Sequence, residues 1–288
     1  MEAGRIEDTC PICASAECTR TEQLSFYMRH GQALSDLWNC GSCGSWWRSF
    51  PSPVHLDEHF AVASYSDLNR EEEWRQSRRS FFDHLVRLTF AAVDRTQGGL
   101  DILDVGCAYG HLMEVFAKEG CRCTGVEPVA GPRELLHRRG AFAVMPSIEA
   151  VPDRGAQFDA ILAIDSLYYM PGPPAAHLRR LARLLKPGGV LIIRIANRAP
   201  AIRFFRMLGR PVTNDLFGDA LFCFSDRGMR TLLKAAGLSL ESWHACEHKN
   251  VPGGDLRGYV LNRILPATAA LTGLKVSPGL TYVCRSSR

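Results

Sequence analysis

The sequence lacks the features that would direct the chain into a membrane or along the secretory route. No stretch approaches the roughly 18 consecutive apolar residues that a membrane-spanning helix requires. The N-terminal segment MEAGRIEDTC has no basic region followed by an apolar one, so we expect no secretory signal and a cytoplasmic protein. The net charge is only +4, which permits an acidic partner without indicating one.

The dinucleotide fingerprint G-x-G-x-x-G is also absent, yet one segment is organised like a ligand-binding strand and turn. Apolar residues at 102, 103 and 105 are typical of a buried parallel strand. Gly106 and Gly110 then flank a turn in which a side chain would block the approach of a ligand. The acid before the turn, Asp104, suits a ligand with a cationic amino group and sulfonium better than a pyrophosphate. Glu127, about 20 residues further on at the end of the next strand, is placed to accept hydrogen bonds from two ribose hydroxyls.

Two later segments follow the same strand-and-turn pattern. Gln157–Asp165 is predicted to form a strand, and Lys186-Pro-Gly-Gly is a turn that leads into the apolar strand Val190–Ile195. Together with the glycine turn, these motifs resemble class I S-adenosylmethionine (SAM) dependent methyltransferases over residues 98–245. The resemblance implies a Rossmann-like α/β fold with a seven-stranded sheet, SAM as the methyl donor, and an in-line transfer to an acceptor. For the glycine turn alone, another nucleotide-binding domain or a bare packing turn is the alternative.

Carried over residue by residue, the resemblance implies two sets of site residues. The SAM contacts would come from Asp104, Gly106, Cys107, Gly110, Glu127, Pro128, Ser147, Ile148, Asp165 and Ser166. Tyr168 and Tyr169 stand where many relatives carry Glu-His, and they are the candidate catalytic residues because they could orient or stack on an acceptor. Ala220 occupies a second position at which the family has histidine. Both changes weaken a mechanism driven by a general base and leave the acceptor open.

Eleven cysteines in a chain without a secretory signal argue against a disulfide framework. Four of them form the pairs Cys10-Pro-Ile-Cys13 and Cys40-Gly-Ser-Cys43, and hairpin strands are expected between the pairs. Two such knuckles can close a tetrahedral four-thiolate zinc site, which has no open position and is therefore structural. Reduced surface thiols or a redox pair are the alternative, and Cys18 is expected to be a bystander.

The chain is predicted to divide into a zinc-ribbon-like module (residues 1–52), a helical linker or lid (residues 53–96) and a methyltransferase domain (residues 97–288). A helical insert is expected within that domain, at residues 251–278. In the linker, Tyr65, Trp74 and Arg78 could cover the SAM pocket, or the helix could simply pack on the core. The helical insert could cover the acceptor pocket or form the contact of a homodimer.

Three functions remain open from the sequence. The first is methyl transfer to a small-molecule acceptor such as a sugar or natural-product intermediate, because bacterial enzymes of that kind share the paired C-x-x-C arrangement. The second is an RNA methyltransferase that uses the Arg-rich stretches at 75–79, 133–139 and 194–210, although the modest net charge speaks against a nucleic-acid partner. The third is a non-catalytic SAM-binding protein, suggested by the two missing histidines.

Overall fold

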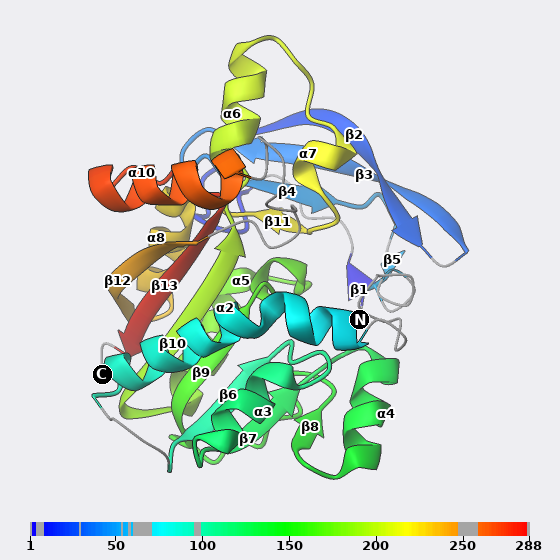
Figure 1. Cartoon of the computed structure of the whole chain (residues 1–288). Helices are drawn as coiled ribbons and strands as arrows, with labels where there is room; N and C mark the ends of the chain where they lie inside the picture. The colour runs from blue at the N-terminus through cyan, green and yellow to red at the C-terminus, as the bar shows by residue number, and fades with distance from the viewer. Residues whose placement is uncertain are drawn as a thin grey trace.

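The computed structural model describes residues 2–3, 9–28, 30–52, 54–56, 59, 71–94, 99–246 and 259–286. Its centre is a seven-stranded sheet with the strand order β12-β13-β10-β9-β6-β7-β8 (Figure 1). These strands are β6 (Asp101–Val105), β7 (Arg122–Val126), β8 (Ala143–Met145), β9 (Phe158–Ile164), β10 (Leu185–Ala196), β12 (Leu238–Cys246) and β13 (Gly279–Ser286). Strands β8, β7, β6, β9 and β10 are parallel, whereas β13 is antiparallel to β10 and β12. The predicted Rossmann-like α/β sheet is confirmed.

Two sequence-based strand boundaries are shifted. The segment Ala141–Val144 reads in the sequence as the third strand, but β8 begins at Ala143, because residues 143–145 are the ones that pair with the end of β7. The Lys186–Gly189 turn was expected before the fifth strand. Instead, β10 begins at Leu185 and carries this turn as an irregularity, since the register with β9 shifts between Leu185 and Val190.

Helices cover both faces of the sheet, as the alternation of side chains along a strand requires. On one face, Ile102 packs with Phe81 and Leu85 of α2 (Glu71–Ala92) and with Phe116 of α3 (His111–Lys118). On the other face, the next residue Leu103 belongs to the core that includes α5 and α8. The remaining elements discussed below are α4 (Ala130–Arg139), η3 (Leu167–Tyr169), α5 (Pro174–Leu184), α6 (Ala199–Met207), α7 (Asn214–Phe217), β11 (Phe222–Cys223), α8 (Asp226–Ala235), η4 (Val260–Ile264) and α10 (Leu265–Thr272).

The N-terminal cysteine module forms a second sheet that takes one strand from the methyltransferase-like part. Its own strands β2 (Cys18–Met28), β3 (Gly31–Cys40) and β4 (Trp46–Ser49) are antiparallel, and β11 adds a fourth strand beside β4. Figure 1 shows this small sheet at the top of the view, above the large one. The expected hairpin is present, and its two strands extend beyond the apolar segments that predicted it. The module therefore shares a continuous sheet with residues far along the chain.

Arg48 fixes the module to the segment that precedes β11. Its side chain is buried, and the guanidinium donates to the carbonyl oxygens of Ala220 at 3.1 Å and Gly218 at 2.8 Å. The same group lies 5.4 Å from the ring centre of Phe26 and 5.2 Å from that of Phe217. Burial lowers the pKa of Arg48 to about 10, so the side chain keeps its charge at neutral pH.

Ser225 joins the module to α8 and gives a first prediction. Its hydroxyl accepts from the Gly228 N–H at 2.9 Å, which caps α8, and it donates to the Cys43 carbonyl at 2.5 Å. We expect Ser225→Ala to lower the free energy of unfolding by about 1–2 kcal/mol, because both interactions are lost. Chemical denaturation measures this change. The exposed Ser239→Ala is the control, and equal stability of the two variants would show that the cap is not needed.

Candidate functional site

The turn after β6 is shaped by packing against neighbouring elements. Gly106 has φ of +82°, and a Cβ there would lie 2.7 Å from the Cβ of Ser166. Gly110 has φ of +78°, and a Cβ there would lie 2.8 Å from a methyl group of Leu136 in α4. The two glycines thus bring the turn against the end of β9 and against α4. The Cβ contacts of Gly110 are with Leu136 and Met113, so packing also requires glycine at this position.

Glu127 is held in one orientation beside this turn. Its side chain is only 2% exposed, and its two oxygens accept from the Ala108 N–H and the Val129 N–H, both at 2.8 Å. Burial raises the pKa of Glu127 to about 7, against the opposing effect of these two N–H groups and of Arg133. Each carboxylate oxygen has a second acceptor position, so the group has the capacity to bind a pair of hydroxyls. Asp104, also buried, lies on the neighbouring strand.

The side chain of Cys107 points into the core. It is buried with Met113 and Leu136, and a Cβ on Gly125 would lie 2.6 Å from its sulfur. Burial raises the pKa of the Cys107 thiol well above its usual range, so the group is a neutral packing element. Any contact of Cys107 with a ligand would therefore use its main chain.

The remaining predicted SAM contacts follow successive strands of the sheet. Pro128 comes directly after Glu127, and its carbonyl accepts from Arg133 at 2.6 Å. After β8, the Ser147 hydroxyl accepts from the Ala150 N–H at 3.3 Å, and Ile148 is buried. Because the carboxyl ends of parallel strands lie along one edge, the sheet brings these residues to the same edge as Glu127.

Two buried polar groups near the turn indicate where a ligand would fit. The hydroxyl oxygen of Ser166 and both ring nitrogens of His111 are buried, and none of these atoms has a hydrogen-bond partner among the residues that the structure describes. Such groups are costly to leave unsatisfied. Ser166 lies against Gly106, and His111 begins α3 directly after Gly110. Each His111 ring nitrogen faces a carboxylate at 3.8 Å, Glu71 for Nε2 and Glu114 for Nδ1, so the Ser166 hydroxyl beside Gly106 is the polar group most available to a ligand at the turn.

Helix α2, the cyan helix of Figure 1, lies above β6 and α3 in that view and contacts the glycine turn through Trp74. The ring of Trp74 packs edge-on against Tyr109 in the turn, with ring centres 6.2 Å apart. The guanidinium of Arg78 lies 3.4 Å from the centre of the Trp74 ring. Trp74 and Arg78 therefore cover the turn from outside. Tyr65, the third residue expected there, lies outside the described residues.

Asp165 follows β9 in a conformation that most residues avoid. Its φ is +56°, in the left-handed region, and its carboxylate forms an ion pair with Arg194 of β10. Arg194 is only 4% exposed. Burial alone would lower the pKa of Arg194, but the charges of Asp165, Cys246 and Tyr168 and the hydrogen bond to Asp165 together outweigh burial and raise it. Sequence reasoning assigned Arg194 to an Arg-rich surface, whereas the structure places it inside the site, where it fixes Asp165.

The two candidate catalytic tyrosines lie one after the other in η3. Tyr168 is buried, and its ring centre lies 4.7 Å from that of Tyr169. The Tyr169 hydroxyl donates to Asp219 at 2.8 Å, and Nε2 of His59 lies 3.6 Å from the other oxygen of Asp219. Sequence reasoning missed both His59 and Asp219. The one available signal was the position of Asp219, directly before the alanine that replaces a family histidine.

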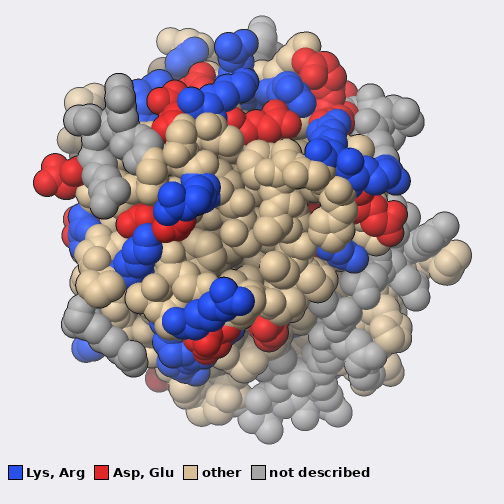
Figure 2. Space-filling view, turned by 90° about the horizontal axis from the view of Figure 1, so that it is seen from below, with Lys and Arg blue, Asp and Glu red and all other residues tan. Residues whose placement is uncertain are grey.

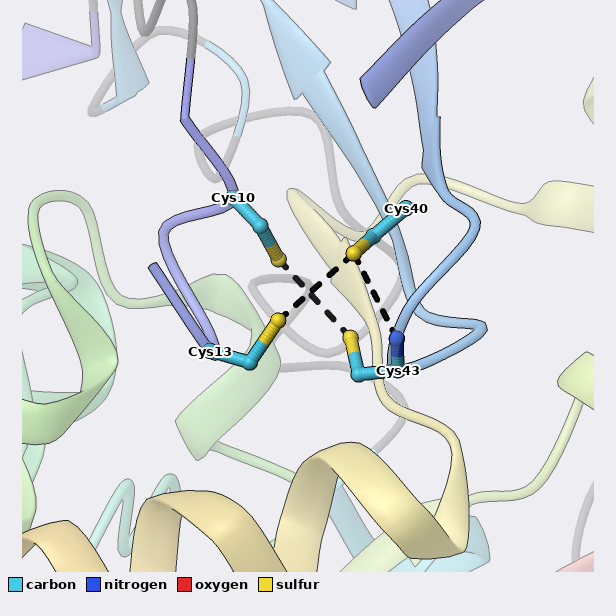
Figure 3. A group of neighbouring side chains, drawn as sticks. All are labelled: Cys10, Cys13, Cys40 and Cys43. Carbon is cyan, nitrogen blue, oxygen red and sulfur yellow. Dashed lines mark hydrogen bonds between the residues drawn. The ribbon is translucent and has the colours of Figure 1, made fainter. Parts of the chain in front are cut away.

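The four paired cysteines converge on one point, as Figure 3 shows. Their sulfur atoms all lie within 4.8 Å of one another, with 3.7 Å between Cys10 and Cys43 and 3.6 Å between Cys13 and Cys40. A tetrahedral site with bonds of about 2.3 Å from zinc to sulfur requires sulfur atoms about 3.8 Å apart. The donor set and its spacing therefore fit zinc.

The two knuckles have matching main-chain geometry. The Ala14 N–H donates to the Cys10 carbonyl at 2.8 Å, and the Gly44 N–H donates to the Cys40 carbonyl at 2.8 Å. Both of these turn residues have positive φ, +59° for Ala14 and +72° for Gly44. The repeated geometry indicates that both loops are shaped to present two sulfur atoms to one ion.

The order of the large sheet, the glycine turn and the buried acid at the end of β7 define a protein of the class I methyltransferase type. Residues 72–243 match a family described as a methyltransferase domain. The match covers more than half of the chain, and the chain belongs to this family.

Curated relatives agree with this assignment. Ubiquinone biosynthesis O-methyltransferase from Xanthomonas oryzae pv. oryzae (strain PXO99A) is 32% identical over 131 residues, which are 43% of this chain and 54% of the relative. The protein of the same name from Xanthomonas axonopodis pv. citri (strain 306) is 30% identical over 167 residues, which are 54% of this chain and 70% of the relative. The chain thus spans about half the length of the first of these relatives.

Solved structures show the same fold at low identity. A chain of the complex between the Haloferax volcanii Trm112 methyltransferase activator and a methyltransferase is 13% identical, with a TM-score of 0.53 over 78% of this chain and 98% of that one. N-methyltransferase NodS from Bradyrhizobium japonicum WM9, in complex with S-adenosyl-L-homocysteine, is 15% identical, with a TM-score of 0.51 over 81% of this chain and 97% of that one. None of the described helices has the length and apolar character needed to cross a membrane.

Proposed function

We propose that the protein transfers a methyl group from SAM to a hydroxyl group of a small molecule. The observation that carries this proposal is the buried carboxylate of Glu127, held by two N–H groups beside the glycine turn. When bound, SAM supplies a reactive methyl group on a good leaving group. The protein then has to align the acceptor and exclude water.

The donor would lie along the edge of the sheet where the predicted contacts come together. Glu127 would accept from the ribose hydroxyls, and Asp104 would face the cationic part of the donor. Ser147 and Ile148 would lie at the adenine, and Asp165 and Ser166 would lie at the sulfonium. Gly106 keeps the glycine turn close to Ser166, so the turn and the end of β9 are fixed relative to one another.

The acceptor would bind at the mouth formed by η3, α7 and the segment before β11. Tyr168, Tyr169 and Asp219 would line this mouth, and α2, which packs on the glycine turn through Trp74 and Tyr109, would cover the donor side. The names of the curated relatives favour an oxygen acceptor in a biosynthetic intermediate. A sugar or natural-product hydroxyl is the acceptor class that we propose for this chain. We also propose that Cys10, Cys13, Cys40 and Cys43 hold one structural zinc ion.

The charge distribution does not favour an RNA acceptor. Arg75 faces Glu71, Glu72 and Glu114 at 3.4–3.6 Å, and Arg139 pairs with Glu71 at 2.7 Å. Figure 2 shows acidic groups beside the basic ones around a largely uncharged centre on the face it draws. Phosphate binding calls for a basic surface that is not already neutralised in this way.

Calorimetry with S-adenosylhomocysteine, followed by assays with methyl-labelled SAM, tests the proposal. The assays use 3,4-dihydroxybenzoate as a phenol, methyl glucoside as a sugar, a bacterial metabolite extract and total bacterial RNA. We expect binding with one site per chain and label in a small, extractable product. Absence of binding would refute the methyltransferase proposal, and label found only in RNA would favour the second function.

A further inference from the structure

Three side chains from distant parts of the chain form a connected group at the acceptor end of the site. The Tyr169 hydroxyl donates to Oδ1 of Asp219 at 2.8 Å. On the other side, Nε2 of His59 lies 3.6 Å from Oδ2 of Asp219. Asp219 therefore lies between a phenol and an imidazole, and its own side chain is half exposed.

The orientation of the His59 ring is set by a hydrogen bond to a carbonyl oxygen and by stacking on Phe26. Its Nδ1 lies 2.6 Å from the carbonyl oxygen of Tyr27, and a carbonyl can only accept, so Nδ1 carries a proton. The ring is also stacked on Phe26, with ring centres 4.1 Å apart and an interplanar angle of 26°. Nε2 is consequently the nitrogen directed at the carboxylate of Asp219.

The surrounding charges keep the carboxylate ionised and the phenol neutral. Burial acts to raise the pKa of Asp219, but the contact with His59, the hydrogen bond from Tyr169 and the charge of Arg198 outweigh burial and lower the pKa to about 2. Burial and the charge of Asp219 raise the pKa of Tyr169 well above its usual range, with Asp165 adding to this effect and Arg198 opposing it. At neutral pH the pair is a phenol that donates to a carboxylate.

We propose that Tyr169 and Asp219 form a proton relay, oriented by His59, that replaces the missing Glu-His base. The proposal rests on the proposed transfer to a hydroxyl. As the acceptor oxygen bonds to the methyl carbon, the carbon–sulfur bond of the sulfonium donor breaks and its electron pair stays on sulfur. The acceptor oxygen becomes strongly acidic as it bonds to the methyl carbon, and its proton passes to the oxygen of Tyr169 in the same step in which the Tyr169 proton passes to Asp219 and then to solvent. Tyr169 is the catalytic residue, and Asp219 and His59 act through it.

Main-chain hydrogen bonds hold the segments that carry Tyr169 and Asp219 next to one another. Tyr169 follows β9, whose end also carries Asp165, and Asp219 precedes a segment that is bonded on both of its sides. In that segment, the Leu221 N–H donates to the Tyr168 carbonyl at 2.9 Å, and the Leu221 carbonyl accepts from the Arg48 N–H at 2.8 Å. The main chain therefore holds both partners of the relay at the point where methyl transfer would occur.

The test compares Tyr169→Phe, Asp219→Asn and His59→Gln in the full-length, zinc-loaded protein, with the surface variant Asp153→Asn as the control. The acceptor is whichever of 3,4-dihydroxybenzoate or methyl glucoside the wild type methylates best. We expect kcat to fall about 100-fold or more in Tyr169→Phe and Asp219→Asn, because positioned proton acceptors contribute at least this much. Affinity for S-adenosylhomocysteine should stay within about twofold of the wild type, since the relay does not contact the donor.

Two further measurements separate a relay from a packing role. The rate of Asp219→Asn should rise with pH up to the pKa of the acceptor hydroxyl, because an ionised acceptor needs no relay, and acetate should partly restore Asp219→Ala. Independently of any acceptor, NMR of ring-labelled tyrosine should show Tyr169 ionising at lower pH in Asp219→Asn than in the wild type.

An unchanged Tyr169 titration, or full activity of either main variant, overturns the relay. Loss of S-adenosylhomocysteine binding in the wild type refutes the proposed function instead.

Discussion

Removal of zinc is expected to unfold the cysteine module and disorder the acceptor end of the site while the donor end stays folded. The buried residues of the module belong to clusters that it shares with the rest of the chain, and structural zinc supplies apparent binding energies of about 10–16 kcal/mol in such sites. Strand β11 pairs with β4, and Leu221 bonds to η3, so loss of the module reaches Tyr168 and Tyr169 directly. The glycine turn and Glu127 contact β7, α3 and α4 and should remain in place.

The measurement is hydrogen exchange on the wild type with and without a strong chelator, and on Cys40→Ser. Protection should be lost in β4, β11 and η3 and kept in β6 and β7, with binding of S-adenosylhomocysteine reduced by less than about tenfold. Cys18→Ser is the matched control, because Cys18 lies close to the cluster without belonging to it. Elemental analysis should find one zinc ion per chain. Unchanged protection in β11 after metal removal would contradict this coupling.

Replacement of Glu127 by glutamine is expected to weaken binding of S-adenosylhomocysteine by about 100-fold or more. A carboxylate that accepts two N–H groups and two hydroxyls cannot be replaced by an amide, because the amide nitrogen would face an N–H donor. The exposed Glu134→Gln on α4 is the control and should bind normally. Equal affinity in the two variants would place the ribose elsewhere.

The same residue predicts a pH dependence with a defined sign. Burial raises the pKa of Glu127 to about 7, and the ligand hydroxyls require the ionised form. Affinity should therefore fall as the pH drops below 7, by about tenfold per pH unit, and binding should release a proton from Glu127. Calorimetry from pH 5.5 to 8 measures this slope. Glu127→Gln should lose it, and a wild-type affinity that does not change over this range would be evidence against the assignment.

The donor half of the site could be predicted because its determinants are local in the sequence. Asp104 lies in β6, Gly106 and Gly110 lie in the turn after it, and Glu127 follows the next strand, so a single strand-turn-helix-strand unit brings them together. The paired cysteines could be predicted for the same reason, since each C-x-x-C knuckle is a local turn. The Ser225 cap follows from the same kind of short-range pattern.

The acceptor half could not be predicted because its contacts join distant segments. His59 reaches Asp219 from the linker, and Arg48 reaches Gly218 from the cysteine module. Nothing in composition or periodicity specifies such pairings, which depend on how two sheets dock. Arg194 shows the same limit, because an arginine in an apolar strand can face solvent or, as here, form a buried ion pair with Asp165.

The shared sheet also sets an order of events during synthesis. The hydroxyls of Ser45 and Ser225, which lie on either side of the β4–β11 junction, are 180 residues apart in the chain. The cysteine knuckles can bind metal as soon as residue 43 has left the ribosome, but β4 remains an unpaired edge until β11 is made. Unpaired edges recruit other strands. The nascent chain must therefore protect this edge during nearly the whole time that the methyltransferase sheet is being synthesised, and a chaperone or slow pairing at β4 is the expected bottleneck of its folding.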